Sequence, residues 1–300
     1  MSFVALRKYA FIFSVVLIIV GMISMSINGL NYGIDFTGGT LLHLDIRQEF
    51  TLEEARDVLA PLGLEAATLQ KVGAEGLAEG EKQELLIQTQ QLTPAEQDEI
   101  FTAFQERYEL TAADLLRVEN VAAIVGGELQ RQALIALLLA GLGMIAYITI
   151  RFEFRFAISA IAALIHDLLV MLAFFSIFQI EVNGPFIAAV LTVLGYSIND
   201  TIVIYDRVRE NLKTRRKEAL ADVVDNSIRQ SLIRTLNTSI TTIIVITTIL
   251  VFGGITLYPF MLALLVGVFF GTYSSIFIAS PLWLAWRERD TRKQLRAKSA

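Results

Sequence analysis

Six long apolar stretches are the feature that most restricts how this chain can fold. They cover residues 9–28, 131–150, 156–178, 185–205, 235–253 and 259–284. Each is close to the roughly 20 apolar residues that an α-helix needs to cross the hydrocarbon core of a bilayer. Hydrophobic residues make up 54% of the chain and charged residues 18%, a more apolar balance than that of soluble domains. We therefore predict an α-helical polytopic membrane protein with six transmembrane helices.

The net charge of −5 is the sum of two opposite parts. Residues 29–130 carry 6 basic and 19 acidic side chains, a net of −13, and the rest of the chain carries a net of +8. The acidic part is interpreted as a solvated surface, with electrostatic steering of a partner chain as the alternative. This balance argues against a nucleic-acid partner. The chain has no cysteine, which excludes disulfides and thiol chemistry.

Basic residues in the short connections set the expected orientation, because Lys and Arg concentrate on the cytoplasmic side of the membrane. They precede the first apolar stretch and follow the second, fourth and sixth, whereas the connections 179–184 and 253–258 have none. All six stretches then agree on both termini being cytoplasmic, with residues 29–130 outside. The first stretch is too long for the apolar part of a signal peptide, so we expect an uncleaved anchor.

These patterns divide the chain into four parts. We expect a cytoplasmic N-terminus with the first transmembrane helix (1–28), a periplasmic α+β domain (29–130), a five-helix transmembrane region (131–284) and a basic cytoplasmic tail (285–300). The five-helix region includes a cytoplasmic segment, 206–234. Its basic part, 211–230, is expected to be a helix held on the inner leaflet by anionic membrane lipids, with a cytoplasmic partner as the alternative.

The periplasmic domain has the pattern of a ferredoxin-like fold. Strands are expected at 40–47, 67–72, 83–89 and 114–123, and helices at 52–62 and 94–108, which gives a βαββαβ order. Thr51 and Glu54 form a capping box, and Thr93 with Pro94 starts the second helix. His43 is expected to be a surface or half-buried strand residue rather than a ligand.

Small residues recur every four positions in the last apolar stretch, which predicts a helix face that another helix can approach closely. The contact is interpreted as one within the bundle, with a partner interface as the alternative. The positions are Ala263, Gly267, Gly271, Ser275 and Ala279.

Charged residues within apolar stretches are costly and need a reason. The fourth stretch contains Asn199 and Asp200, and Arg234 stands at the start of the fifth. An Asp200–Arg234 pair is expected, either as a structural ion pair or as a titratable carboxylate in an ion path. Helical spacing places Thr192, Tyr196, Asn199 and Asp200 on one face, and Thr241 with neighbouring threonines extends a polar seam on the fifth helix.

The third stretch contains the adjacent pair His166-Asp167. It is a candidate polar relay, with hydrogen bonding between helices as the equally weighted alternative. An intramembrane hydrolase using His166, Asp167 or Ser197 is disfavoured, because the chain contains neither H-E-x-x-H nor G-x-S-x-G. We therefore expect a protein that is not an enzyme and has no cofactor and no metal site.

Three motifs give the chain a resemblance to a known family. They are the glycine motif Gly33–Thr40 (GIDFTGGT), the pair His166-Asp167, and the run Gly195–Asn211 (GYSINDTIVIYDRVREN). The chain resembles SecF, the smaller subunit of the SecD–SecF protein-export complex, in the resistance–nodulation–division superfamily. The likeness covers nearly the whole chain.

The resemblance implies a role and partners. It implies an auxiliary subunit of the Sec translocase that works with SecD, beside the SecYEG channel, and uses a proton or sodium gradient to help export preproteins across the bacterial inner membrane. Asp200, Asn199 and Arg234 match the positions implicated in ion passage. Gly33, Asp35, Gly38 and Gly39 belong to the glycine motif, which matches the family's entry motif and in which Gly38 and Gly39 are expected to allow a tight turn, with substrate contact of the motif as the alternative. The alternative function is a half-subunit of a small-molecule or lipid exporter of the same superfamily.

Overall fold

A computed structural model describes residues 2–72, 83–215, 218–254 and 257–299, and it divides into two compact units. The helical unit comprises Met1–Asn31 and Leu134–Ala300, and the α+β unit comprises Tyr32–Ala133. The side chains of Ala123 and of residues 291–300 lie outside the description, which includes most of the basic tail expected at 285–300. Each unit is considered by itself.

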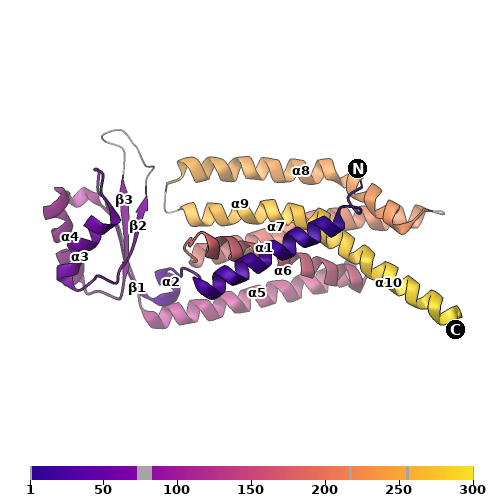
Figure 1. Cartoon of the computed structure of the whole chain (residues 1–300), viewed down its shortest axis with the longest axis horizontal. Coiled ribbons are helices and arrows are strands. Elements are labelled where there is room, and N and C mark those ends of the chain that lie inside the picture. Colours follow the sequence, from indigo (N-terminus) through magenta and orange to yellow (C-terminus); the bar gives the residue numbers. More distant parts are fainter. Residues whose placement is uncertain (1, 73–82, 216–217, 255–256, 300) are drawn as a thin grey trace. The chain divides into compact units, whose positions relative to one another are not determined.

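Six helices in the described residues are long and apolar enough to cross a membrane, as predicted (Figure 1). They are α1 (Arg7–Ile27), α5 (Ala123–Arg151), α6 (Phe154–Ile177), α7 (Gly184–Thr214), α8 (Leu220–Phe252) and the continuous run of α9 (Tyr258–Ser274), a π-helical turn (Ser275–Ala279) and α10 (Ser280–Ser299). Helix α5 begins in the α+β unit and continues into the helical unit.

Helices α7 and α8 are longer than the apolar stretches that predict them. The segment 206–234, expected to be a separate element, consists mainly of the last turns of α7 and the first turns of α8. The amide of Asn211 donates to Ser227 Oγ at 2.8 Å and to Gln230 Oε1 at 3.0 Å, which ties these two helix ends together. The expected contact of this segment with lipid stays a prediction.

The ridge of small residues on α9 lies against α7, in agreement with a contact inside the bundle. A Cβ added to Gly267 would lie 2.3 Å from Cγ2 of Val193, and one added to Gly271 would lie 3.0 Å from Cβ of Ser197. The two backbones can approach this closely because the ridge carries almost no side-chain volume.

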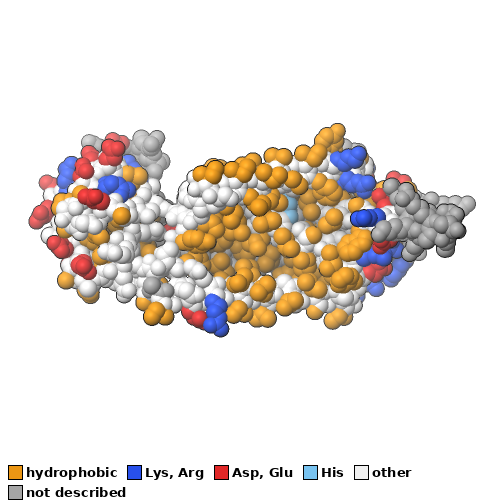
Figure 2. Space-filling view, turned by 60° about the horizontal axis from the view of Figure 1, so that its bottom comes forward, with side chains coloured by type: hydrophobic (Ala, Val, Ile, Leu, Met, Phe, Trp, Pro, Cys, Tyr) orange, Lys and Arg blue, Asp and Glu red, His pale blue; other side chains and the backbone are white. Residues whose placement is uncertain are grey.

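An aromatic cluster fills the helical unit at the end where α10 begins. The rings of Phe156 and Trp283 stack at 4.5 Å between centroids, and Tyr205 lies 4.6 Å from Phe156. Elsewhere the surface of this unit is broadly hydrophobic, and Lys and Arg gather at one end of it (Figure 2). A hydrophobic surface of this extent is expected of helices that face lipid or another membrane helix rather than water.

The α+β unit contains a four-stranded antiparallel sheet in the order β2-β3-β1-β4, which fits the predicted ferredoxin-like split. Its core lies between the sheet and two helices, where Leu42, Leu44, Ile87 and Phe104 are fully or almost fully buried. The elements are α2 (Ile34–Thr37), β1 (Gly39–Asp45), α3 (Leu52–Leu59), a 3₁₀ turn (Ala60–Leu62), β2 (Thr68–Val72), β3 (Glu84–Thr89), α4 (Pro94–Tyr108), a 3₁₀ turn (Ala112–Asp114) and β4 (Leu115–Val121).

Local capping rules explain where the helices of this unit begin. Thr51 and Glu54 form the predicted capping box, and Thr93 and Glu96 form a second one at the start of α4.

His43 is more buried than expected, at 5% exposure, and its Nε2 lies 2.7 Å from Glu84 Oε2 on the neighbouring strand. The Gly- and Glu-rich connection between β2 and β3 lies outside the described residues.

Candidate functional site

Asp200 lies in the middle of α7 and is almost fully buried, at 1% exposure. Its Oδ2 accepts a hydrogen bond of 3.5 Å from Ser239 of α8, and the Ser239 hydroxyl pairs with Thr272 Oγ1 of α9 at 2.6 Å. The carboxylate therefore lies where α7, α8 and α9 meet, with hydroxyl groups as its described hydrogen-bond partners.

The expected Asp200–Arg234 ion pair is not formed among the described residues, since no nitrogen of Arg234 lies within 4.0 Å of a carboxylate oxygen of Asp200. Arg234 is exposed on α8, although it is close enough to attract the Asp200 carboxylate electrostatically. It lies 14 residues after Leu220, the first residue of α8, because this helix begins well before the apolar stretch that predicts it. The apolar stretch underestimated the length of the helix.

The predicted polar face of α7 splits into two. Asp200 points into the bundle, whereas Thr192 and Asn199 are exposed and Tyr196 is half-buried among apolar residues of α8 and α9. On α8, Thr241 is exposed as well, and its hydroxyl donates to backbone carbonyls of its own helix. These exposed polar residues on α7 and α8, together with Arg234, are called the exposed polar strip below, and the buried Asp200 is not one of them.

Asp167 is the centre of a second buried cluster, which joins three helices. Its Oδ2 accepts hydrogen bonds from Ser197 of α7 at 2.7 Å and from Ser274 of α9 at 2.9 Å. Its Oδ1 lies 3.0 Å from Nδ1 of His166, its neighbour on α6. Three hydrogen-bond partners satisfy this fully buried carboxylate without a water molecule.

His166 extends this cluster to α1. Its Nε2 lies 3.0 Å from Ser14 Oγ, and Ser14 in turn lies 3.3 Å from the hydroxyl of Tyr273. The order Ser14–His166–Asp167 has the connectivity of a hydrolytic triad. However, Ser14 is only 4% exposed, which leaves no described opening through which a substrate could reach it.

Sequence reasoning did not predict the hydrogen bonds of four consecutive hydroxyl residues on α9 and its π-helical turn. Thr272, Tyr273, Ser274 and Ser275 all bond to other helices. Their presence as an unbroken polar run in an apolar stretch was the available signal. Small hydroxyl residues are common in membrane helices, so the run alone did not identify which carboxylates it contacts.

The glycine motif has a backbone role in the α+β unit. Gly38 and Gly39 have φ values of 72° and 132°, as predicted for a turn that favours glycine. A Cβ on Gly39 would lie 2.2 Å from the carbonyl oxygen of Thr89 on β3. Gly33 caps α2, and Asp35 lies in the first turn of this short helix.

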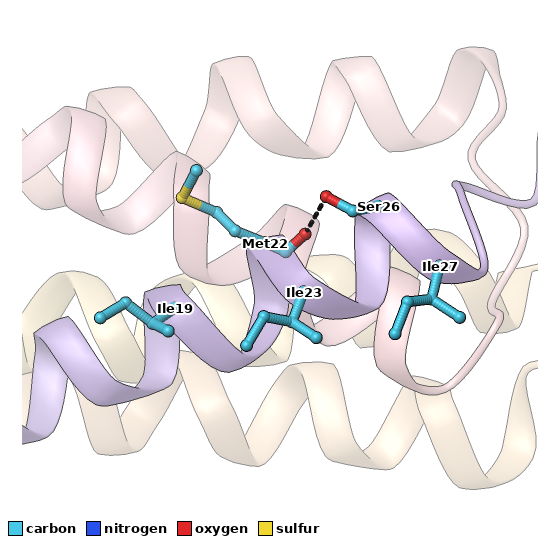
Figure 3. Close-up of a pocket in the computed structure, with 5 residues that line it drawn as sticks. All are labelled: Ile19, Met22, Ile23, Ser26 and Ile27. Carbon is cyan, nitrogen blue, oxygen red and sulfur yellow. Dashed lines mark hydrogen bonds between the residues drawn. The ribbon is translucent and has the colours of Figure 1, made fainter.

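A hollow of about 380 Å³ opens on the surface of α1 (Figure 3). Its lining is Ile19, Met22, Ile23, Ser26 and Ile27, and the Ser26 hydroxyl is turned back to the carbonyl of Met22 at 2.8 Å. These residues provide no acid, base or metal ligand. The described residues also contain no group of three His, Cys, Asp or Glu side chains placed to hold a metal ion.

Comparison with known proteins assigns the family. A model of the protein export membrane protein SecD/SecF, C-terminal region, matches residues 102–289, and a SecD/SecF GG motif matches residues 23–44. The chain belongs to the SecF family. A protein translocase subunit SecF of Desulfurispirillum indicum is 40% identical, over 98% of this chain and 94% of that protein.

Fused relatives contain this family as one part of a longer chain. A protein translocase subunit SecDF of Bacillus subtilis is 39% identical over 97% of this chain but only 39% of its own length. The crystal structure of SecDF from Thermus thermophilus, described as a translocon-associated membrane protein, matches with a TM-score of 0.87 and 36% identity. That match covers 96% of this chain and 39% of the other, so this multi-pass membrane protein corresponds to part of SecDF.

Proposed function

We propose that this chain is an auxiliary subunit of the Sec protein translocase that uses a transmembrane ion gradient to promote export of preproteins. The observation that carries the proposal is Asp200. It is a buried carboxylate midway along a membrane helix, and the hydroxyl groups that bond to it are those of Ser239 and Thr238 on α8. Burying a charge inside the membrane is costly, and a structural role alone gives no reason for that cost. Gain and loss of a proton, or exchange of a sodium ion, by this carboxylate gives such a reason.

The exposed polar strip on α7 and α8 indicates how the ion path is completed. Asn199, Arg234 and Thr241 are all exposed in the isolated chain. Polar groups at membrane depth are stable only against protein or a water-filled cavity. In the fused relatives a second half is present on the same chain, and we propose that a separate SecD covers this strip here.

The placement in the cell follows from the same proposal. We propose that the chain resides in the bacterial inner membrane with both termini cytoplasmic, because the basic connections then lie inside. The α+β unit then faces the periplasm, where it meets the emerging preprotein beside the SecYEG channel. No enzymatic step is part of this function: the work comes from ion movement, which supplies about 2.3 kcal/mol per charge across 100 mV.

The test is export in inverted vesicles that hold the full chain with SecD and the channel. Asp200→Asn keeps the size of the side chain and removes its titration, so gradient-dependent export is expected to be lost while the complex still assembles. The matched control is Asp206→Asn, which changes an exposed carboxylate on the same helix and should leave export unchanged. Export by Asp200→Asn at the level of this control would exclude the proposed function.

A further inference from the structure

Two buried carboxylates, Asp167 and Asp200, are both held through the same few residues of α9. Ser274 donates directly to Asp167 at 2.9 Å. Thr272, two residues earlier, pairs with the Ser239 hydroxyl that donates to Asp200. Any displacement of this part of α9 therefore acts on the surroundings of both carboxylates.

Helix α7 joins the two carboxylates a second time. Ser197 donates to Asp167 at 2.7 Å and stands one turn before Asp200 on the same helix. The Ser275 hydroxyl lies 2.8 Å from Thr201 Oγ1, beside Asp200, and 3.2 Å from the carbonyl oxygen of Ser197. The α7 turn that carries Asp200 is thus fixed from both sides by residues of α6 and α9.

A π-helical turn begins between the two neighbouring serines that make these contacts. It begins at Ser275, directly after the last residue of α9, and ends at Ala279. A π-helical turn accommodates an extra residue and changes the direction of the side chains around it, and such turns often occur at functional sites. Here Ser274 reaches Asp167 and Ser275 reaches α7.

The connection between the two carboxylates is mechanical and does not form a proton wire. Ser275 reaches Ser197 through the backbone carbonyl of Ser197, and Ser274 and Ser275 both bond to the carbonyl of Gly271. Backbone carbonyls accept hydrogen bonds but have no proton to pass on. Among the described residues, no unbroken series of hydroxyl groups leads from Asp167 to Asp200.

We propose that Asp167 is a positioning residue that sets the geometry of Asp200. Its three partners on α6, α7 and α9, and the link from His166 to Ser14 on α1, form a fixed anchor inside the membrane. The anchor fixes the α7 turn that carries Asp200 and, through α9, the position of Thr272, whose hydroxyl pairs with the Ser239 that bonds to Asp200. This inference rests on the proposed function, because it assigns Asp167 to support of the ion site rather than to a step in ion transfer.

Other titratable and charged groups on the helices around the two carboxylates enter the test. Besides Asp167 they include Arg234 on α8, His166 on α6, Tyr273 on α9 and Tyr196 on α7 itself. Arg234 acts on Asp200 electrostatically and is left unchanged in every variant, so that a change in titration reports the anchor alone.

Infrared spectroscopy of the full-length chain in lipid vesicles gives a direct readout. The carbonyl band of protonated Asp200 is identified as the pH-dependent band that Asp200→Asn lacks. Ser274→Ala and Asp167→Asn are each expected to move the midpoint of this band upward by about one pH unit, because weakening one hydrogen bond to a charged group corresponds to a shift of that size. Ser231→Ala removes a buried hydroxyl that bonds to its own helix and should not move it.

Ion flux in vesicles with SecD separates an anchor from a relay. Asp167→Asn is expected to lower the flux about tenfold without abolishing it, whereas Asp200→Asn abolishes it. Should Asp167→Asn fail to assemble, the single-hydroxyl variants Ser274→Ala and Ser197→Ala carry the same prediction. An unchanged Asp200 titration in these variants would overturn the inference, and so would complete loss of flux in Asp167→Asn with an unshifted band. Failure of the proposed function shows separately, as export that persists in Asp200→Asn.

Discussion

The capping carboxylates of the α+β unit and the buried polar groups of the helical unit find their partners in opposite ways. In the α+β unit, Glu54, Glu96 and Asp114 each bond to the backbone and hydroxyl of a threonine three residues earlier. In the helical unit, His166 bonds to Ser14, 152 residues away, and Asp167 bonds to Ser274, 107 residues away. The first kind of bond can be predicted from a short stretch of sequence, whereas the second forms only after the helices have packed.

The difference follows from the solvent that each unit is built for. Water satisfies the exposed polar groups of a soluble domain, so its carboxylates can serve local helix ends while apolar residues form the core. A membrane interior supplies no water, so a buried carboxylate must be satisfied by neighbouring helices. In the helical unit, therefore, the buried carboxylates are hydrogen-bonded only when the helices pack closely.

The largest effect is expected at Gly21, where α1 and α6 approach each other closely. A Cβ on Gly21 of α1 would lie 2.0 Å from Cβ and 2.8 Å from Cα of Ala173 on α6. Gly21→Val should lower the free energy of unfolding of the helical unit by about 1–3 kcal/mol or more, because backbone must move. Thermal unfolding in detergent, followed by circular dichroism, measures it.

Gly141→Val on α5 is the matched control for this prediction. A Cβ at Gly141 would have no described atom within 4 Å, so its melting temperature should stay near that of the unaltered chain. Equal melting temperatures for the two variants would show that the α1–α6 contact is not needed for stability, which would contradict the link between packing and polar bonding.

The next effect tests the closest backbone approach in the α+β unit. Gly39→Ala places a Cβ 2.2 Å from the Thr89 carbonyl at a φ of 132°, and should cost about 1–3 kcal/mol. Hydrogen exchange of β1 and β3 amides should accelerate, while amides of α7 keep their protection. Gly63→Ala, at a φ of 71° but with no described atom within 4 Å, should cause a smaller change. Equal acceleration in both would assign the effect to φ alone.

Sequence reasoning reached the fold because both of its main signals are local. Apolar runs of about 20 residues give the membrane helices, and threonine–glutamate spacing gives the starts of α3 and α4. The helix expected at 211–230 instead belongs to two helices, because α7 ends at Thr214 and α8 begins at Leu220. Charged residues continue a helix outside the membrane without any hydropathy signal, so the apolar stretches did not mark these ends.

The site was predictable only in its outline. Asp200, Asn199 and Arg234 could be singled out by type and place, but not their surroundings. Asp200 is buried while its neighbour Asn199 is exposed, a difference of one residue that depends on how α7 is rotated against α9. The donors to Asp167, which are Ser197 and Ser274, come from two different helices. No spacing rule within one helix can provide such pairs.

A smaller and purely local effect is expected from the capping box of α4. Thr93→Ala removes the hydroxyl that accepts a hydrogen bond from the backbone amide of Glu96, and should lower the free energy of unfolding by about 1 kcal/mol. Hydrogen exchange should rise mainly in the first turn of α4. Thr102→Ala, which removes an exposed hydroxyl bonded to its own helix, is the control. A rise that extended into the membrane helices would break the distinction between the two units.

The smallest effect concerns acid. The pKa of Asp114 lies below its ordinary value, because the backbone amide and hydroxyl of Thr111 donate to its carboxylate and Arg47 attracts it. A lowered folded-state pKa means that this stabilisation is complete above the unfolded-state pKa of about 3.9 and is lost as the pH falls through the folded-state value. Between pH 7 and pH 3, β4 amides should therefore lose protection, after correction for intrinsic exchange.

Asp114→Asn should reduce this pH dependence, and Thr111→Ala should do the same by removing one donor. A pH dependence that is unchanged in both variants would assign the acid sensitivity to other carboxylates. The capping residues Glu54 and Glu96 would then be replaced next. Their pKa values are also lowered, because Thr51 and Thr93 donate hydrogen bonds to them.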